Sequence, residues 1–287
     1  MIRAGLIGAG GIAWRHAEGL ALMDDVEITA VVDIDGDSAA SLAREYGAKA
    51  YNKLDDCLDE VDAVWILTPP SFHREMALTA MERGKHILCE KPISISLKDA
   101  EAIWESSCTH DVCFMMGFNM RFRHSYGKMK SIVSSGEIGE VINCWSHRIG
   151  LGAGSKGGWQ GYNWRTDKRL MCGMSIESLS HDIDMMRWLT GDIADVSATV
   201  DESIGELPGF DDNANVSLSL ENGGIASIFA SWSSHITQNS RGVVGTKGTV
   251  IIEGPGIWDV SRIRLMTEGM ENERVEIVEN DTLDYRS

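Results

Sequence analysis

The segment GKHILCEKPISIS, residues 84–96, puts an acid, a base and a proline side by side at the end of an apolar run. Glu90, Lys91 and Pro92 follow a stretch that has the pattern of a buried strand. A charged surface turn is the commoner fate of such a tripeptide. In an open parallel sheet, however, the carboxyl ends of the strands face the ligand crevice. There the Lys91 ammonium could stabilise negative charge that develops on a substrate oxygen.

A second group of ionisable residues lies in ESLSHDIDMMRWLTG, residues 177–191. In a continuous helix one face would carry Glu177, His181, Asp184 and Trp188. A roughly opposite apolar stripe would consist of Ile176, Leu179, Ile183 and Met186. A carboxylate one turn from a histidine can orient the imidazole and stabilise its charged form, so the pattern favours acid–base chemistry. A solvated helix face is the simpler alternative, although a tryptophan is unusual there. A metal site is not predicted, because HExxH spacing and a third ligand are missing.

A glycine-rich motif predicts a dinucleotide site. Gly8, Gly10 and Ala13 form G-x-G-x-x-A between an apparent strand and an apparent helix. Glycine lets the backbone approach a pyrophosphate, and the helix N-terminus supplies N–H groups and a positive dipole. Asp33 ends the second apparent strand 20 residues after Ala13. A carboxylate there binds a ribose 2′-OH and repels a 2′-phosphate, so Asp33 and, less strongly, Asp35 favour NAD over NADP. The cofactor contacts predicted in this region are Gly8, Gly10, Gly11, Ile12 and Asp33.

The segment TPPSFH, residues 68–73, follows another apolar run. Its two prolines make a rigid loop, and its place beside the dinucleotide site makes it a candidate wall for the nicotinamide. A plain strand-to-helix connection with Ser71 as N-cap is the simpler alternative. Trp164 and Arg165 could line the substrate site, with packing as an equal alternative. We interpret His16, His110, His124 and His235 as structural or surface residues.

The elements that must position these residues follow from the apolar pattern. In the first part of the chain, strands are predicted at 2–8, 26–33, 62–68, 85–90 and 112–118. Helices are predicted between them at 11–22, 37–46, 71–83 and 96–109. This alternation indicates βαβ units and a parallel sheet, and continuous apolar runs are typical of strands buried on both faces.

After Asn119 the pattern changes. Helices are predicted near 122–135 and 174–190, a strand near 140–149, and a loop at the glycine-rich segment 150–158. Strands at 215–220, 225–232, 241–246 and 249–254 then follow one another without helices, which indicates an antiparallel sheet. Strict alternation in 215–220 predicts one buried and one wet face. We therefore expect an α/β chain with a Rossmann domain at 1–118 and a second α/β domain at 119–287.

Composition narrows the class of protein. The 287 residues are 43% hydrophobic and 24% charged, as in soluble globular proteins, and carry a net charge of −17. The absence of a basic run argues against nucleic acid and against anionic membranes as partners. The six cysteines form no CxxC pair, which favours reduced thiols in a cytoplasmic protein. We see neither a signal peptide nor an apolar run of transmembrane length.

Together these segments resemble the Gfo/Idh/MocA family of NAD(P)-dependent oxidoreductases. The resemblance rests on GLIGAGGIAWRH (5–16), TPPSFH (68–73), GKHILCEKP (84–92), GFNMRF (117–122), GEIGEV (136–141), HDIDMMRWLTG (181–191) and GTKGTV (245–250), which follow the family's order over nearly the whole chain. It implies a second domain with a large, mostly antiparallel open sheet, and a homodimer or homotetramer formed through that sheet. It also implies that the substrates are sugars, cyclitols or related polyols. Relatives continue with more sheet and a terminal helix beyond the position of residue 287, so the second domain is either truncated or that of a genuinely short member.

The resemblance also assigns roles to single residues. It implies that Lys91 lies between nicotinamide and substrate, that Lys91–Pro92 is a cis peptide, and that His181 is the acid/base. Where many members have aspartate four residues before that histidine, this chain has Glu177, whose extra methylene moves the carboxylate. We therefore predict three catalytic residues: Lys91, His181 and Glu177. Further cofactor contacts are predicted at Thr68, Pro69, Pro70, His73, Glu90, Lys91 and Asn119. Substrate contacts are predicted at Lys91, Trp164, Arg165, Asp184 and His181.

The function expected from these features is hydride transfer between NAD and a carbinol carbon of a sugar or polyol. Two alternatives stay open, because fold does not dictate function. One is a non-catalytic NAD-binding regulator or sensor. The other is an NAD-using enzyme that cleaves glycosides by borrowing and returning a hydride.

Overall fold

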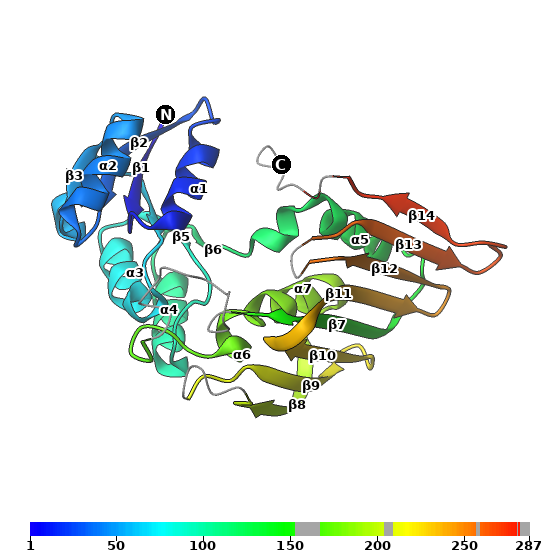
Figure 1. Cartoon of the computed structure of the whole chain (residues 1–287). Helices are drawn as coiled ribbons and strands as arrows, with labels where there is room; N and C mark the ends of the chain where they lie inside the picture. The colour runs from blue at the N-terminus through cyan, green and yellow to red at the C-terminus, as the bar shows by residue number, and fades with distance from the viewer. Residues whose placement is uncertain (153–166, 204–208, 257–258, 280, 282–287) are drawn as a thin grey trace. The chain divides into compact units, whose positions relative to one another are not determined.

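The computed structural model describes residues 1–152, 167–203, 209–256, 259–279 and 281 (Figure 1). The chain divides into two units. The first consists of Met1–Gly117 with Arg169–Met171, and the second of Phe118–Lys168 with Cys172–Ser287. Each unit has its own sheet.

The first unit is built on a six-stranded sheet in the order β3-β2-β1-β4-β5-β6. Its strands are β1 (Ile2–Ile7), β2 (Val26–Val32), β3 (Lys49–Tyr51), β4 (Ala63–Ile66), β5 (His86–Cys89) and β6 (Phe114–Met116). Every neighbouring pair is parallel, as predicted. Only β3, which is three residues long and lacks an apolar pattern, was missing from the prediction. The order reverses between β1 and β4, which is where open α/β sheets bind ligands.

Helices cover both faces of this sheet (Figure 1). They are α1 (Gly11–Leu20), α2 (Gly36–Tyr46), α3 (His73–Glu82) and α4 (Leu97–Thr109), with short turns η1 (Leu54–Asp56), η2 (Leu58–Glu60) and η3 (Pro70–Phe72). Leu6 joins the core formed with α1 and α2, whereas Ile7 joins the core formed with α3 and α4. Successive side chains of one strand thus enter opposite cores, because strand side chains alternate between faces. This is the Rossmann arrangement predicted from the sequence.

The second unit contains an eight-stranded sheet in the order β14-β13-β12-β11-β7-β10-β9-β8. Its strands are β7 (Val141–Leu151), β8 (Ile193–Asp201), β9 (Asn213–Leu220), β10 (Ile225–Ser231), β11 (Ser233–Gly245), β12 (Gly248–Gly254), β13 (Arg262–Thr267) and β14 (Arg274–Ile277). Neighbouring strands are antiparallel except for the parallel pair β7 and β10. The prediction of a large, mostly antiparallel sheet is therefore confirmed.

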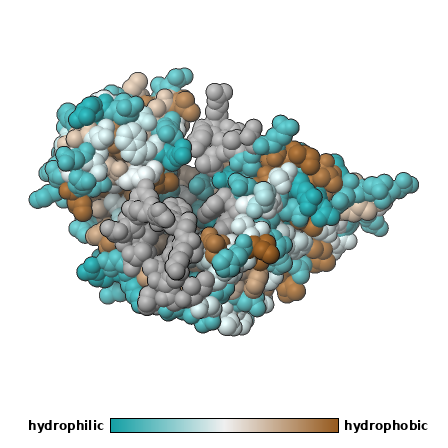
Figure 2. Space-filling view, viewed as in Figure 1, coloured by the Kyte–Doolittle hydropathy of each residue, from teal (hydrophilic) through white to brown (hydrophobic). Residues whose placement is uncertain are grey.

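The core of this unit lies on one face of the sheet. Besides the turn η4 (Asn119–Phe122), the helices are α5 (His124–Ser134), α6 (Met174–Glu177) and α7 (Ser180–Thr190). Residues of α5 and α7 share one core cluster with the sheet. In β9, Ala214, Val216 and Leu218 are buried while the residues between them are exposed, which confirms the predicted alternation. Apolar groups such as Val196 and Phe229 remain exposed in this unit, and Figure 2 shows apolar residues at its surface.

The predicted helix at 174–190 is interrupted, so that prediction was wrong in one respect. The amides of Ser178 and Leu179 both donate to the Met174 carbonyl, at 2.8 and 3.1 Å. This doubled acceptor ends α6 at Glu177, and α7 begins at Ser180. Ile176 is consequently 45% exposed instead of lying in an apolar stripe. Glu177 and His181 lie on opposite sides of the break rather than on one continuous helix.

Candidate active site

The turn between β1 and α1 has the geometry of an anion cradle. Gly8 has a φ of +101°, and a Cβ there would lie 2.9 Å from the Leu67 carbonyl oxygen, so only glycine fits. A Cβ on Gly10 would meet no atom within 4 Å. Gly10 is the N-cap of α1, and no side chain caps this helix end in the described structure. The first backbone N–H groups of α1 can therefore receive a phosphate.

Asp33 is fixed beside this turn at the end of β2. Its Oδ2 accepts a hydrogen bond from the Ala9 amide at 2.7 Å, and its Oδ1 accepts one from the Asp35 amide at 2.9 Å. Each carboxylate oxygen keeps a lone pair for a ribose hydroxyl. Asp35 is instead the N-cap of α2, and its carboxylate accepts hydrogen bonds from the Asp37 amide at 3.1 Å and from the Ser38 hydroxyl at 2.8 Å. Of the two acids, Asp33 is the one whose placement fits cofactor selection.

The loop after β4 is hydrogen-bonded to the buried side chain of His73. The His73 side chain is fully buried, and its Nε2 lies 2.9 Å from the Thr68 carbonyl oxygen. Desolvation lowers the pKa of this imidazole, while nearby backbone groups of Thr68, Ile93 and Pro92 partly oppose the shift. We predicted His73 as a cofactor contact, but the structure buries its ring in the interior. Its observed role is to shape the loop that contains Thr68.

At the end of β5, Glu90 joins the predicted lysine to α1. Its Oε2 accepts a hydrogen bond from the Lys91 amide at 3.1 Å, and its Oε1 lies 3.0 Å from His16 Nε2. A carboxylate can only accept, so the His16 nitrogen carries the proton. A Cβ on Gly117 would come within 3.1 Å of the same carboxylate. The Lys91–Pro92 peptide is cis, as the resemblance implied.

His16 was missed as part of this group. Our sequence analysis interpreted it as structural or surface, yet it lies on α1 and contacts Glu90, 74 residues away. The available signal was its position three residues after Ala13, one turn into the helix that follows the glycine motif.

In the second unit, both members of the predicted acid–imidazole pair are buried. His181 is 3% exposed and Glu177 is 7% exposed, so the alternative of a solvated helix face is wrong. The His181 ring packs edge-to-face against Phe118, with 6.1 Å between ring centroids. The start of α6, which leads to Glu177, is held by Asp211, whose Oδ2 accepts from the Ser175 amide at 2.8 Å. Glu177 on α6 and His181 on α7 are thus buried residues of two short helices.

The remaining predicted site residues lie in different environments. Asp184 accepts hydrogen bonds from Arg121 Nε at 2.8 Å and from Arg121 Nη2 at 2.5 Å. The Arg121 guanidinium also lies 5.8 Å from the centroid of the Trp188 ring, and Trp188 packs against the core. Asn119 is exposed at the start of η4. Trp164 and Arg165 lie outside the described residues.

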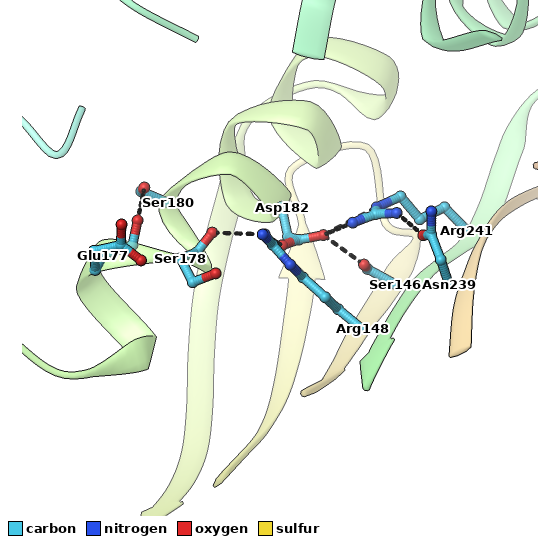
Figure 3. Close-up of polar contacts among 8 residues, drawn as sticks. All are labelled: Ser146, Arg148, Glu177, Ser178, Ser180, Asp182, Asn239 and Arg241. Carbon is cyan, nitrogen blue, oxygen red and sulfur yellow. Dashed lines mark hydrogen bonds and ion pairs between the residues drawn. The ribbon is translucent and has the colours of Figure 1, made fainter. Parts of the chain in front are cut away.

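Next to His181 the structure contains a buried ion cluster that sequence reasoning missed (Figure 3). Asp182 Oδ1 accepts from Ser146 Oγ at 2.7 Å and from Arg241 Nη2 at 2.8 Å, while Asp182 Oδ2 accepts from Arg148 Nη1 at 2.9 Å. Desolvation would raise the pKa of Asp182, but Arg241 and Arg148 outweigh it and hold this pKa well below its ordinary value. Arg148 shares the alternation of the buried Ser146 along β7, which was the one available signal. Figure 3 shows Glu177 apart from this cluster.

Comparison with known proteins decides the family. Residues 2–118 match the model of the Gfo/Idh/MocA oxidoreductase family, NAD-binding Rossmann fold, and residues 126–251 match a Gfo/Idh/MocA C-terminal domain. Myo-inositol 2-dehydrogenase of Thermotoga maritima is 30% identical over 263 residues, which cover 88% of this chain and 75% of that protein. The chain belongs to the Gfo/Idh/MocA family. Its first unit is therefore the NAD-binding Rossmann domain of that family.

Two further comparisons concern a part of the chain and the fold. Glucose-6-phosphate 3-dehydrogenase of Bacillus subtilis is 34% identical over 147 residues, 51% of this chain but only 42% of that protein. The structure of levoglucosan dehydrogenase in complex with NADH and levoglucosan has a TM-score of 0.86 at 21% identity, covering 96% of this chain and 80% of that one. The latter match shows that the two proteins share their fold.

Two general features complete the description of this Gfo/Idh/MocA chain. Among the described residues, no group of three or more His, Cys, Asp and Glu side chains is arranged to hold a metal ion. No helix within the described ranges has the length and hydropathy needed to cross a membrane.

Proposed function

We propose that this Gfo/Idh/MocA member is an NAD-dependent dehydrogenase that acts on a CH–OH group of a sugar, cyclitol or related polyol. The observation that carries the proposal is Glu90, which fixes the Lys91 backbone at the end of β5 in the same unit as the glycine cradle. The dehydrogenase names of its relatives, which include a myo-inositol and a glucose-6-phosphate enzyme, support the substrate class.

The cofactor would be held by groups of the first unit. The N–H groups at Gly10, Gly11 and Ile12 would receive the pyrophosphate, and Asp33 would accept from the ribose hydroxyls. Thr68, Pro69 and Pro70 would border the nicotinamide side. When bound, NAD supplies the hydride acceptor. NADP is the less favourable cofactor, because its 2′-phosphate would meet the Asp33 carboxylate at like charge.

The chemistry assigned to the chain's own residues is charge stabilisation and proton transfer. The Lys91 ammonium would donate a hydrogen bond to the reacting oxygen and stabilise its developing negative charge. A ring nitrogen of His181 would take the hydroxyl proton, and Glu177 would orient the ring. We assign Asp184 the structural role of holding Arg121, to which both of its oxygens are hydrogen-bonded.

We further propose that the protein is a cytoplasmic homodimer or homotetramer formed through its eight-stranded sheet. No disulfide joins the six cysteines, all of which lie in the described part of the chain, and this suits a reducing compartment. Exposed apolar side chains on β8 and β10, among them Val196, Val200 and Phe229, suit a contact between copies. Light scattering on the purified chain gives the number of copies, and a monomer at micromolar concentration would contradict the assembly.

The function is tested with a panel of sugars and cyclitols, monitored by nicotinamide absorbance. We expect net reduction of NAD by at least one member of the panel. Lys91→Ala should lower kcat at least about a hundredfold, and His181→Ala should lower it by about 10²–10⁴, both with NADH affinity retained. NADH binding without turnover on any member would favour the sensor alternative. Cleavage of a glycoside without net change in the nicotinamide would favour the glycoside-cleaving alternative.

A further inference from the structure

We propose that Arg148, held by Asp182, is a positioning residue for the reaction, because it fixes the backbone at the α6–α7 break and thereby the placement of His181. The inference rests on the proposed role of His181 as the proton acceptor. Neither arginine nor aspartate is required to touch substrate.

The link runs through the carbonyl oxygen of Ser178. This oxygen accepts a hydrogen bond from the His181 amide at 3.3 Å and another from Arg148 Nη1 at 2.9 Å. The same Arg148 nitrogen lies 2.9 Å from Asp182 Oδ2. One guanidinium of β7 therefore contacts both Ser178 and Asp182 (Figure 3). His181 lies between these two residues in the chain.

The break is the place where such an external contact acts on the backbone. At the junction the amides of Ser178 and Leu179 share the Met174 carbonyl, so the regular one-to-one ladder of helical hydrogen bonds is lost there. The Ser178 carbonyl keeps the His181 amide as one donor, and its second lone pair can accept from a partner outside the helix. Ser178 is 3% exposed, and Arg148 supplies that partner from the sheet. The orientation at the start of α7, where His181 lies, consequently depends on β7.

Two buried arginines, Arg148 and Arg241, pair with the single carboxylate of Asp182, and their contacts differ. Arg241 donates to Asp182 Oδ1 through Nε at 3.0 Å and through Nη2 at 2.8 Å, and its guanidinium lies 5.5 Å from the centroid of the Tyr126 ring. This fully buried pair is neutral by itself. Arg148 adds a second buried positive charge, at 2% side-chain exposure, and burying a charge opposes folding unless the charge is compensated. Arg241 is sufficient to pair with the buried Asp182 carboxylate. Arg148 is the arginine that also donates to the Ser178 carbonyl.

Because Arg241 also pairs with Asp182, a variant that lacks the Arg148 charge should still fold. Arg148→Met removes the guanidinium and its hydrogen bond to Ser178 but keeps the stem volume, leaving Asp182 paired with Arg241. We expect kcat on the substrate found in the panel to fall at least about tenfold, since small misplacement of a reacting group has large kinetic effects. KM and the NADH dissociation constant should stay within about twofold of wild type. Arg148→Lys, which retains a cation and a donor, should recover part of kcat.

The matched control is Val250→Ala on β12. Val250 is fully buried in the core of the same unit, and its partners in the neighbouring strands are Val243 and Leu265 rather than residues of the ion cluster. It should lower the melting temperature while kcat stays near wild type, so destabilisation alone cannot mimic the expected result. Circular dichroism and thermal melts establish folding of each variant.

The outcomes distinguish this inference from the proposed function. Wild-type kcat in folded Arg148→Met overturns the positioning role, even if His181→Ala is inactive. If Arg148→Met fails to fold, Arg148→Lys decides: a kcat reduced relative to both wild type and Val250→Ala supports the role, and an unchanged kcat overturns it. Wild-type kcat in His181→Ala instead refutes the proton acceptor named under the proposed function, and the inference falls with it.

Discussion

At the scale of single residues, Glu90 couples the cofactor cradle to the lysine. One of its carboxylate oxygens is hydrogen-bonded to the His16 Nε2 of α1, and the other accepts a hydrogen bond from the Lys91 amide. Because α1 begins at the glycine turn, Glu90 links the helix that follows this turn to the segment that contains Lys91. At 21% and 13% side-chain exposure for His16 and Glu90, the contact is partly shielded from solvent, so it should be worth more than a surface ion pair.

This coupling gives a prediction for His16. His16→Ala should lower kcat by about tenfold, because Glu90 loses the contact that fixes its second oxygen and Lys91 is less well oriented. His16→Gln can still donate to the carboxylate and should recover most of the rate. Steady-state kinetics with saturating NAD measure both. An unchanged kcat in His16→Ala would mean that the Lys91 amide alone is sufficient to hold Glu90.

A second prediction concerns Asp33. Wild type should bind NAD at least about tenfold more tightly than NADP, because the carboxylate pairs with ribose hydroxyls and repels a 2′-phosphate. Asp33→Asn removes the charge but keeps an oxygen for the Ala9 amide, so the preference should narrow mainly through tighter NADP binding. Fluorescence titration of the reduced nucleotides measures all four dissociation constants. Equal affinity of wild type for both nucleotides would refute the assignment.

At the scale of elements, the short helix α6 depends on a partner from outside it. A helix of four residues is not stable by itself, and this one is anchored by Asp211, whose backbone carbonyl accepts from the Met174 amide at 2.9 Å. Gly173, the N-cap, allows this approach, since a Cβ there would lie 2.0 Å from Asp211 Oδ1 and 2.6 Å from the Asp211 backbone nitrogen. The anchoring therefore constrains Glu177 at the other end of α6.

Gly173→Ala should consequently displace α6, and we expect both a lower melting temperature and a lower kcat. The matched control is Gly127→Ala in α5, where a Cβ would meet no atom within 4 Å. There alanine should stabilise by up to about 1 kcal/mol through helix propensity and leave kcat unchanged. Thermal melts and kinetics of the pair test the prediction, and it is wrong if the two variants behave alike.

At the scale of the whole molecule, buried ionisable groups determine how stability responds to pH. The pKa of Asp182 is held low by its two arginines, so its contribution is present above the ordinary aspartate pKa and is lost only in strong acid. The pKa of His73 is lowered from 6.5, first by desolvation. Above pH 6.5 the folded and unfolded chains both hold His73 neutral, and below it only the unfolded chain takes up the proton. Stability should therefore fall as the pH falls from about 6.5 towards the folded pKa.

His73→Gln, which keeps a donor near the Thr68 carbonyl but cannot titrate, should remove this part of the pH dependence. Between pH 7.5 and 5.5 we expect wild type to lose more free energy of unfolding than the variant, by at most about 1.4 kcal/mol per pH unit. Urea unfolding at both pH values provides the comparison. Parallel losses in the two proteins would place the pH sensitivity in other groups.

The sequence by itself determined the features that repeat locally. The alternation of apolar runs and helical patterns predicted the parallel sheet, the period of two in β9 predicted its buried face, and the spacing from Gly8 to Asp33 predicted the cofactor cradle, because each depends on residues a few positions or one βαβ unit apart. Lys91 and His181 were singled out in local motifs, and their catalytic roles, which the family resemblance implied, stay predictions.

Only the tertiary structure decided which distant residues meet. The His16–Glu90 contact spans 74 residues, and the Asp182–Arg241 contact spans 59. The segments beside the α6–α7 break likewise contact Arg148 and Asp211, which lie outside the helical pattern around Glu177 and His181. In the sequence the two arginines look like charged positions of half-exposed strands; their burial follows from the sheet order, which brings β7 and β11 together beneath α7. Local periodicity reports which face of an element is apolar, whereas the partner of a buried charge depends on which elements become neighbours.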